Sequence, residues 1–202
     1  MKAVVFDFGG VMTTVTLPER VRKLAGELGL PWDAIRAGYD RYRHDYDGGF
    51  MTIDEMYGKI WADAGLTVTP EQHAQILEED LSSFLYRNER TLAWMRALKA
   101  QGLKIGILTN MAADASVKFR EFFTDFFDLA DATVISGFEH LYKPQRQIFD
   151  LLRERIGLPA EELLFVDDVE ENCEGARRAG WTAIRFISND QVECDFAHGL
   201  WK

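Results

Sequence analysis

Polar residues that could do acid–base, metal or phosphate chemistry stand where apolar runs of the sequence end. Asp7 follows the run AVVF, and the other groups are Thr109-Asn110 after KIGIL, Lys143 before Pro144, and Asp167-Asp168 after LLFV. Each of these residue types is common in turns and helix caps, so one group alone indicates little. Their repeated placement at the ends of apolar runs indicates a shared site.

Three of these residues are carboxylates. An ionised Asp7 behind an apolar strand is costly unless a cation or hydrogen-bond donors meet it. Asp167 and Asp168 would bring more negative charge to the same rim, and converging carboxylates repel one another. A hard divalent cation relieves that repulsion, and Mg²⁺ accepts oxygen ligands while keeping several waters. The three residues therefore predict a Mg²⁺ site.

The remaining groups suit an anionic ligand. Thr109 and Asn110 precede the predicted helix AADASVKF and would offer a hydroxyl, an amide and helix N-terminal N–H groups. Lys143 adds a point charge that could hold both a phosphate and an attacking carboxylate. The expected ligand is a phosphate ester.

These residues need a sheet that brings several strand ends together. Strand patterns occupy residues 2–8, 104–110, 132–136, 163–168 and 182–187, and helical patterns occupy 91–102, 113–123, 145–157 and 170–180. This alternation indicates a parallel sheet covered by helices, whose ligand crevice lies at the carboxyl ends of the strands. The predicted fold class is α/β, with a doubly wound, Rossmann-like sheet.

A long helical block separates the first two strands. Its periodic segments are residues 18–29, 31–49, 52–65 and 70–85, with Gly or Pro between them. The block is therefore predicted to be a helical cap inserted after the first strand. The expected organisation is a core of residues 1–16 and 91–202 and a cap of residues 17–90.

Size and charge limit the possible functions. The chain has 202 residues, of which 47% are hydrophobic, so it can form one domain, or one domain with an insert, around a sizeable core. Its 23 basic and 33 acidic residues give a net charge of −10, the wrong sign for a nucleic-acid or anionic-membrane surface. The expected partner is a small molecule, and the oligomeric state is left open.

Cysteine usage and hydropathy point to a compartment. Cys173 and Cys194 fit neither a disulfide framework nor a metal-binding spacing. Asp7 interrupts the N-terminal apolar run too early for a signal peptide, and no later run has the length of a membrane span. A soluble cytoplasmic protein is expected.

In their order along the chain, these motifs resemble those of the haloacid dehalogenase superfamily. The matching residues are Asp7 with Gly9-Gly10, Leu108-Thr109-Asn110, Lys143-Pro144, and Phe165-Val166-Asp167-Asp168 followed by Asn172. The helical insert is similar to the small cap of that superfamily. The FDxGGV form of the first motif is similar to the phosphatase domain of soluble epoxide hydrolases and to bacterial sugar-1-phosphate phosphatases. The resemblance implies a Mg²⁺-dependent phosphomonoester hydrolase for a small phosphorylated metabolite.

The resemblance also implies a role for each residue. Asp7 would be the nucleophile that forms an aspartyl phosphate, with Lys143 neutralising it and the phosphate. The implied substrate-binding residues are Gly10, Thr109, Asn110 and Lys143. The implied metal ligands are Asp7, the Gly9 carbonyl and Asp168, with Asp167 at or beside the metal and Asn172 behind it.

Gly9 departs from the superfamily pattern. Most phosphatases that the chain resembles carry a second Asp two residues after the nucleophile, which protonates the leaving group and later activates water. Such a group contributes about 10²–10⁴-fold, so turnover should be slow unless another side chain or a good leaving group substitutes. His44 could replace it, because histidine is a common general acid and base, although an exposed helix-end histidine without a role is the commoner case.

Two other functions stay open. Asp7 could displace halide from a small 2-halo acid without a metal, but the pair Asp167-Asp168 disfavours a reaction that needs no cation. Alternatively, a chain that has lost the acid at Gly9 could be a non-catalytic module that binds phosphorylated metabolites. A phosphate-release screen with and without Mg²⁺ would decide among these functions.

Overall fold

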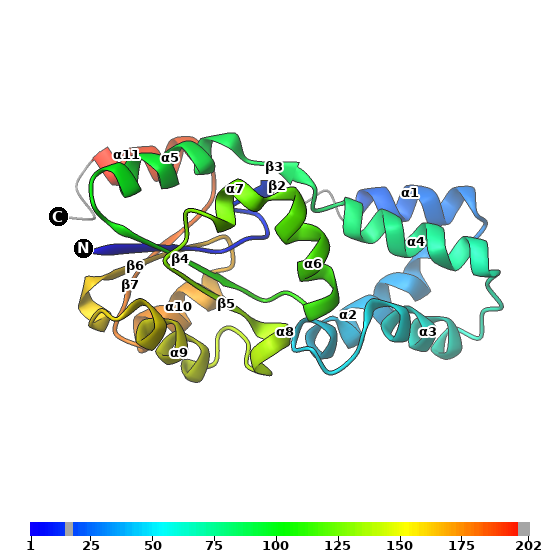
Figure 1. Cartoon of the computed structure of the whole chain (residues 1–202). Helices are drawn as coiled ribbons and strands as arrows, with labels where there is room; N and C mark the ends of the chain where they lie inside the picture. The colour runs from blue at the N-terminus through cyan, green and yellow to red at the C-terminus, as the bar shows by residue number, and fades with distance from the viewer. Residues whose placement is uncertain (15–17, 198–202) are drawn as a thin grey trace.

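A computed structural model describes residues 1–14 and 18–197. Its main sheet has five parallel strands in the order β5-β4-β1-β6-β7 (Figure 1). The strands are β1 (Ala3–Phe6), β4 (Lys104–Thr109), β5 (Ala132–Ile135), β6 (Leu163–Asp167) and β7 (Thr182–Arg185). Each strand lies within a segment predicted as a strand, so the doubly wound α/β fold is confirmed.

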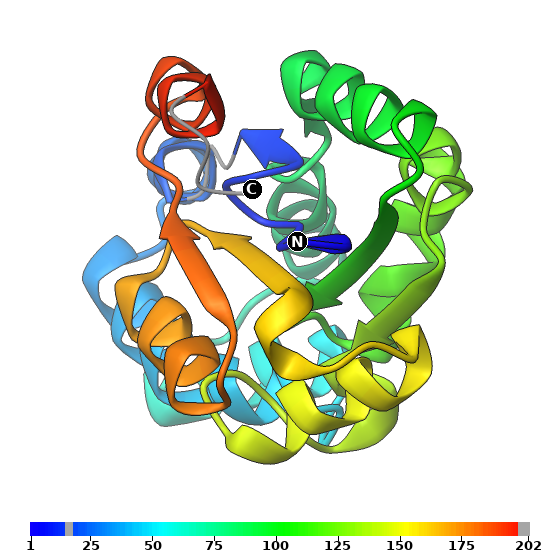
Figure 2. The same ribbon diagram turned by 90° about the vertical axis from the view of Figure 1, so that its left-hand side faces the viewer.

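Helices cover both faces of this sheet, which is why all residues of β1 are buried. One face is covered by α5 (Glu89–Ala100) and α11 (Asn189–Ala197), and the other by α9 (Arg146–Ile156) and α10 (Glu170–Arg178) (Figure 2). Successive strand residues point to opposite faces. Val4 and Phe6 accordingly pack with the first pair of helices, and Val5 packs with the second.

The strand order reverses beside β1. From β1 the chain passes to β4 and then to the edge strand β5, and it returns to the other side of β1 for β6 and β7. The carboxyl ends of β1 and β6 therefore form the switch point where ligands of such sheets bind. Asp7 directly follows β1, and Asp167 is the last residue of β6.

Four helices follow β1 in the chain and lie beyond the carboxyl ends of the strands (Figure 1). They are α1 (Glu19–Glu27), α2 (Trp32–Asp47), α3 (Ile53–Asp63) and α4 (Pro70–Ser82), and we call them the helical insert. Helices α3 and α4 each begin with a complete capping box, headed by Thr52 and Thr69. The predicted boundary between residues 16 and 17 lies outside the described residues.

Several short elements complete the fold. Strands β2 (Thr13–Thr14) and β3 (Tyr86–Arg87) pair where the chain leaves and re-enters the sheet region, and the others are α6 (Ala113–Phe122), α7 (Thr124–Phe127), α8 (Ser136–Glu139) and the 3₁₀ helix η1 (Ala160–Glu162). Only α6 was predicted from the sequence, because elements of two to four residues show no periodicity. None of the described helices has the length and apolar character needed to cross a bilayer.

Candidate active site

A buried group of charges lies at the switch point. Lys143 Nζ is 2.7 Å from Asp7 Oδ1 and 2.6 Å from Asp167 Oδ2. The side chains of Lys143 and Asp167 are 1% and 0% exposed, so this contact lies almost entirely out of solvent. Buried charges persist only when they are paired and hydrogen-bonded. One lysine here serves two carboxylates, which leaves the group with excess negative charge.

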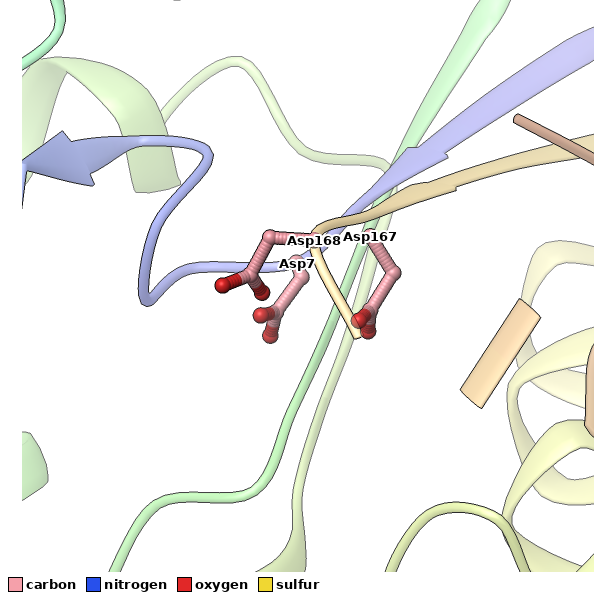
Figure 3. Close-up of side chains that lie close together, drawn as sticks. All are labelled: Asp7, Asp167 and Asp168. Atoms are coloured by element: carbon pink, nitrogen blue, oxygen red, sulfur yellow. The ribbon is translucent and has the colours of Figure 1, made fainter. Parts of the chain in front are cut away.

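Asp168 adds a third carboxylate. One carboxylate oxygen from each of Asp7, Asp167 and Asp168 lies within 4.8 Å of the other two. Figure 3 shows the three side chains close together after β1 and at the end of β6. Unlike the other two residues, Asp168 is only partly buried. A set of converging carboxylate oxygens with access to water suits a hard cation such as Mg²⁺.

Burial is the largest influence on the pKa of Asp7 and raises it from 3.8 to about 7. Lys143 opposes this shift, while the negative charges of Asp167 and Asp168 add to it. Burial and then Asp167 also raise the pKa of Asp168. Burial lowers the pKa of Lys143, but Asp167 and Asp7 outweigh that effect and raise it overall. The lysine is therefore charged, and the carboxylates still lack positive charge.

Asp167 is fully engaged by its neighbours. Asn172 Nδ2, on α10, donates to Asp167 Oδ1 at 3.1 Å and to Oδ2 at 3.2 Å. The Val169 N–H group donates to Oδ1 at 2.8 Å. Asp167 therefore holds Lys143 in place from behind the site, whereas the more exposed Asp168 is better placed to reach a cation.

The turn after Asp7 brings the backbone close to Asp168. Gly10 has a φ of 78°, and a Cβ atom at this position would lie 2.5 Å from Asp168 Oδ2. Glycine is needed here for both reasons. Phe8 anchors the same turn, because its buried ring packs 4.9 Å from the ring of Phe123.

Thr109 and Asn110 differ in what their side chains can offer. Thr109 is buried at the end of β4. The Asn110 amide already brackets the backbone of Lys143, donating from Nδ2 to its carbonyl at 3.0 Å and accepting from its N–H at 2.8 Å. The Met111 N–H donates to Ser136 Oγ, and α6 begins only at Ala113. The Asn110 side chain thus positions Lys143, and α6 begins three residues beyond it.

His44 lies on α2 at the edge of the same region. It is exposed, and its ring packs edge-on against Tyr142, with 3.8 Å between ring centroids. Tyr142 directly precedes Lys143 in the chain, so the helical insert reaches the loop that carries the lysine. Helix α9, predicted over residues 145–157, begins at Arg146.

Sequence patterns missed two residues that join the helical insert to the site. Ser136, fully buried, accepts from the Met111 N–H at 2.8 Å and donates to the Asp47 carbonyl at the end of α2. Gly49 has a φ of 76°, and a Cβ there would lie 2.1 Å from the Gly137 carbonyl oxygen. A serine after a strand and a glycine after a helix carry no functional signal, so these contacts emerge only in the folded chain.

The sequence model of haloacid dehalogenase-like hydrolases matches residues 1–180. The chain belongs to this hydrolase family. Among its curated relatives, Sesquiterpene phosphatase astK of Aspergillus oryzae is 25% identical over 93% of this chain and 91% of its own length. Phosphatase MT3486 of Mycobacterium tuberculosis is 26% identical over 91% of this chain and 86% of its own length.

Solved structures of the family share the fold. The haloacid dehalogenase family enzyme bt-2542 of Bacteroides thetaiotaomicron, in complex with magnesium and inorganic phosphate, superimposes with a TM-score of 0.74 at 23% identity. The match covers 92% of this chain and 93% of that one. The two chains therefore share one overall fold.

Proposed function

We propose that this hydrolase is a Mg²⁺-dependent phosphomonoesterase that acts on a small phosphorylated metabolite through an aspartyl phosphate on Asp7. The observation that carries the proposal is the convergence of three carboxylates at the switch point of the sheet, two of which contact one buried lysine. The phosphatase names of its relatives and the magnesium and phosphate bound by bt-2542 support it.

In this proposal Asp7 attacks phosphorus to form an acyl phosphate, and water later splits the bond between phosphorus and the Asp7 oxygen. Lys143, already 2.7 Å from Asp7, orients the carboxylate and neutralises phosphoryl oxygens as they approach. Gly10, Thr109 and Asn110 line the phosphoryl position beside it. Asp7, the Gly9 carbonyl and Asp168 would hold Mg²⁺, with Asp167 beside them. When bound, the ion supplies positive charge to the carboxylates and to the phosphoryl group.

The helical insert would act as a cap. Residues 17–90 would form the cap and residues 1–16 and 91–202 the core. The insert lies beyond the carboxyl ends of the strands and touches the lysine loop through His44 and Tyr142. A cap in this place excludes water and bulky or polymeric substrates from the site.

Metal-free dehalogenation is disfavoured, because a third carboxylate within 4.8 Å of Asp7 repels an anionic halo acid unless a cation is present. A phosphate-binding module without turnover is favoured only by the missing side chain at Gly9. The two alternatives predict halide release in EDTA and ligand binding without phosphate release, respectively.

The deciding experiment is a phosphate-release screen of the purified chain. The panel contains sugar, nucleotide, acyl, aryl and prenyl phosphates, each with Mg²⁺, with EDTA, and with Mg²⁺ restored. We expect release that EDTA abolishes and Mg²⁺ restores, and Asp7→Asn is the matched inactive control. Halide release from 2-chloropropionate in EDTA, or binding of the panel without release, would overturn the proposal.

A further inference from the structure

The site has a nucleophile and a charge-neutralising lysine, but the position two residues after the nucleophile carries no side chain that could act as a general acid. Gly9 presents only backbone where a side chain two residues after Asp7 could reach a leaving oxygen. A phosphate ester with a poor leaving group needs a proton on that oxygen as the bond to phosphorus breaks. The helical insert lies opposite the carboxyl ends of the strands, so a proton donor is expected on the insert.

The C-terminal end of α2 is fastened to the core at this place. The Asp47 carbonyl accepts from Ser136 Oγ, and Ser136 accepts in turn from the Met111 N–H, two residues after Thr109. Two residues beyond Asp47, the backbone of Gly49 approaches the Gly137 carbonyl so closely that no Cβ would fit. One turn before Asp47, His44 packs on Tyr142.

The carboxyl group of Asp47 is free on one side. Its Oδ2 accepts from Arg43 Nε at 2.8 Å, whereas Oδ1 is buried and has no hydrogen-bond partner among the described residues. The side chain is 15% exposed. The bond of its backbone carbonyl with Ser136 and the contact of His44 with Tyr142 place this end of α2 beside the loops that follow β4 and precede Pro144. An unpartnered buried oxygen in such a position calls for a ligand atom or a proton.

We propose that Asp47 is the residue of the helical insert that protonates the leaving oxygen and later activates water. This role rests on the proposed phosphatase function. It places the general acid on the insert, opposite Gly9, so that the core needs no side chain at that position. Arg43 holds Oδ2, so Oδ1 is the oxygen left to carry the proton.

The proposed reaction has two halves, and Asp47 loses its proton in the first and regains it in the second. An Asp7 oxygen forms a bond to phosphorus while the bond from phosphorus to the leaving oxygen breaks. That oxygen takes the proton of the Asp47 carboxyl, so an alcohol departs and Asp47 is left as a carboxylate. In the second half, Asp47 accepts a proton from the water that attacks phosphorus. Phosphate leaves, and Asp7 and the protonated Asp47 are regenerated.

The charges around Asp47 allow this cycle. Burial raises its pKa, and Arg43, His44 and Lys143 lower it without cancelling the effect. The titratable and charged groups that act with it are Arg43, His44, Tyr39 and Tyr46 on α2, Asp80 on α4 and Lys143 from the core. Only the protonated Asp47 carboxyl can donate a proton, and the fraction of molecules in that state decreases as pH rises. The raised pKa of Asp47 extends the range in which the carboxyl is protonated toward neutral pH.

The test compares a poor and a good leaving group. Glycerol 2-phosphate releases an alkoxide that must be protonated, and p-nitrophenyl phosphate releases a phenolate that needs no proton. In Asp47→Asn we expect kcat/KM for the alkyl ester to fall about 10²-fold. We expect kcat/KM for the aryl ester to change little. Adding Gly9→Asp to Asp47→Asn should recover part of the alkyl activity.

Matched controls separate chemistry from structure. Asp80→Asn removes another buried carboxylate near Arg43, and His44→Gln removes the neighbouring titratable ring; both should leave the alkyl-to-aryl ratio unchanged. In the wild type alone, this ratio should fall as pH rises, a readout that needs no variant to fold. A ratio independent of pH in the wild type, or an equal loss on both esters in Asp47→Asn, overturns the role of Asp47. Absence of phosphate release from both esters in the wild type overturns the proposed function instead.

Discussion

Two buried groups of charged side chains in this molecule have a similar excess of carboxylates over cations but different surroundings. The site cluster comprises Asp7, Lys143, Asp167 and Asp168, and the insert cluster comprises Arg43, Asp47 and Asp80. In each, one cation faces more carboxylates than it can neutralise. Burial accordingly raises the pKa of Asp7 to about 7 and that of Asp80 to about 6.

The surroundings decide what each imbalance does. In the insert cluster the Arg43 guanidinium lies 5.2 Å from the centroid of the Tyr39 ring and 5.4 Å from that of Phe84, and Tyr57 donates to Asp80 at 2.8 Å. The site cluster instead opens through the partly exposed Asp168 and the turn of Gly9 and Gly10. Excess charge enclosed as at Asp80 is a cost to folding, whereas excess charge that solvent can reach is a place for a cation.

The largest effect is expected from a substitution in the site cluster. Asp7→Asn keeps the shape of the side chain and removes the attacking charge, so phosphate release should fall by about 10⁴-fold or more. The melting temperature should not decrease, because the amide also removes a charge that Asp167 and Asp168 repel. Phosphate release and thermal unfolding of the same preparation check both statements. Activity within about 100-fold of the wild type would remove Asp7 from the nucleophile role.

The two acids after β6 should respond differently. Asp168→Ala should raise the Mg²⁺ concentration for half-maximal activity at least about tenfold, because Asp168 is the more exposed carboxylate of the cluster. Asp167→Ala removes the partner of Lys143 and Asn172 and should mainly lower the free energy of unfolding, by about 3 kcal/mol. Mg²⁺ titrations and urea unfolding of both variants measure the contrast. Equal Mg²⁺ titrations would contradict it.

The sequence predicted the parts of the site that follow from sheet geometry. Asp7 and Asp167 end neighbouring parallel strands, and the carboxyl ends of such strands meet at one edge of the sheet. Apolar runs that stop at polar residues therefore suffice to bring carboxylates together. The alternation of strand and helix patterns likewise predicted the sheet, since the central strands β1, β4 and β6 are buried on both faces.

The contacts across the site could not be predicted in the same way. The pairing of the Asn110 amide with the Lys143 backbone joins two loops, and the bond from Ser136 to Asp47 joins the core to the helical insert. Such contacts depend on how loops close, and no periodicity in the chain records that closure. For that reason His44 was the apparent replacement acid, although the carboxyl of Asp47 carries the unpartnered oxygen.

A pH-dependent prediction concerns the insert cluster. Burial raises the pKa of Asp80 from 3.8 to about 6, against the opposing effects of Arg43 and Tyr57. A raised folded-state pKa means that the contribution of this group to stability is present below about pH 4 and is lost as pH rises through 6. Asp80→Asn should therefore gain stability relative to the wild type between pH 4 and pH 7, by about 3 kcal/mol at most.

Urea unfolding at intervals between these pH values measures the difference between variant and wild type. The exposed Asp45 of the same helix as Arg43 provides the control, because Asp45→Asn should show a difference that is nearly independent of pH. A flat difference for Asp80→Asn as well would mean that Arg43 compensates Asp80 fully, and that the two clusters do not share the same imbalance.

The smallest expected effect compares two tyrosines of the helical insert. Tyr46 is 2% exposed, and its hydroxyl has no hydrogen-bond partner among the described residues, whereas the Tyr57 hydroxyl donates to Asp80 at 2.8 Å. Removing an unsatisfied buried hydroxyl is nearly neutral or stabilising, while removing the donor to a buried carboxylate costs about 1–3 kcal/mol. Tyr46→Phe should therefore change the free energy of unfolding by less than about 1 kcal/mol, toward greater stability, and Tyr57→Phe should lower it. Urea unfolding at pH 7 measures both. An equal loss in the two variants would show that the Tyr46 hydroxyl is satisfied in solution, and that the insert cluster is less enclosed than its aromatic surroundings indicate.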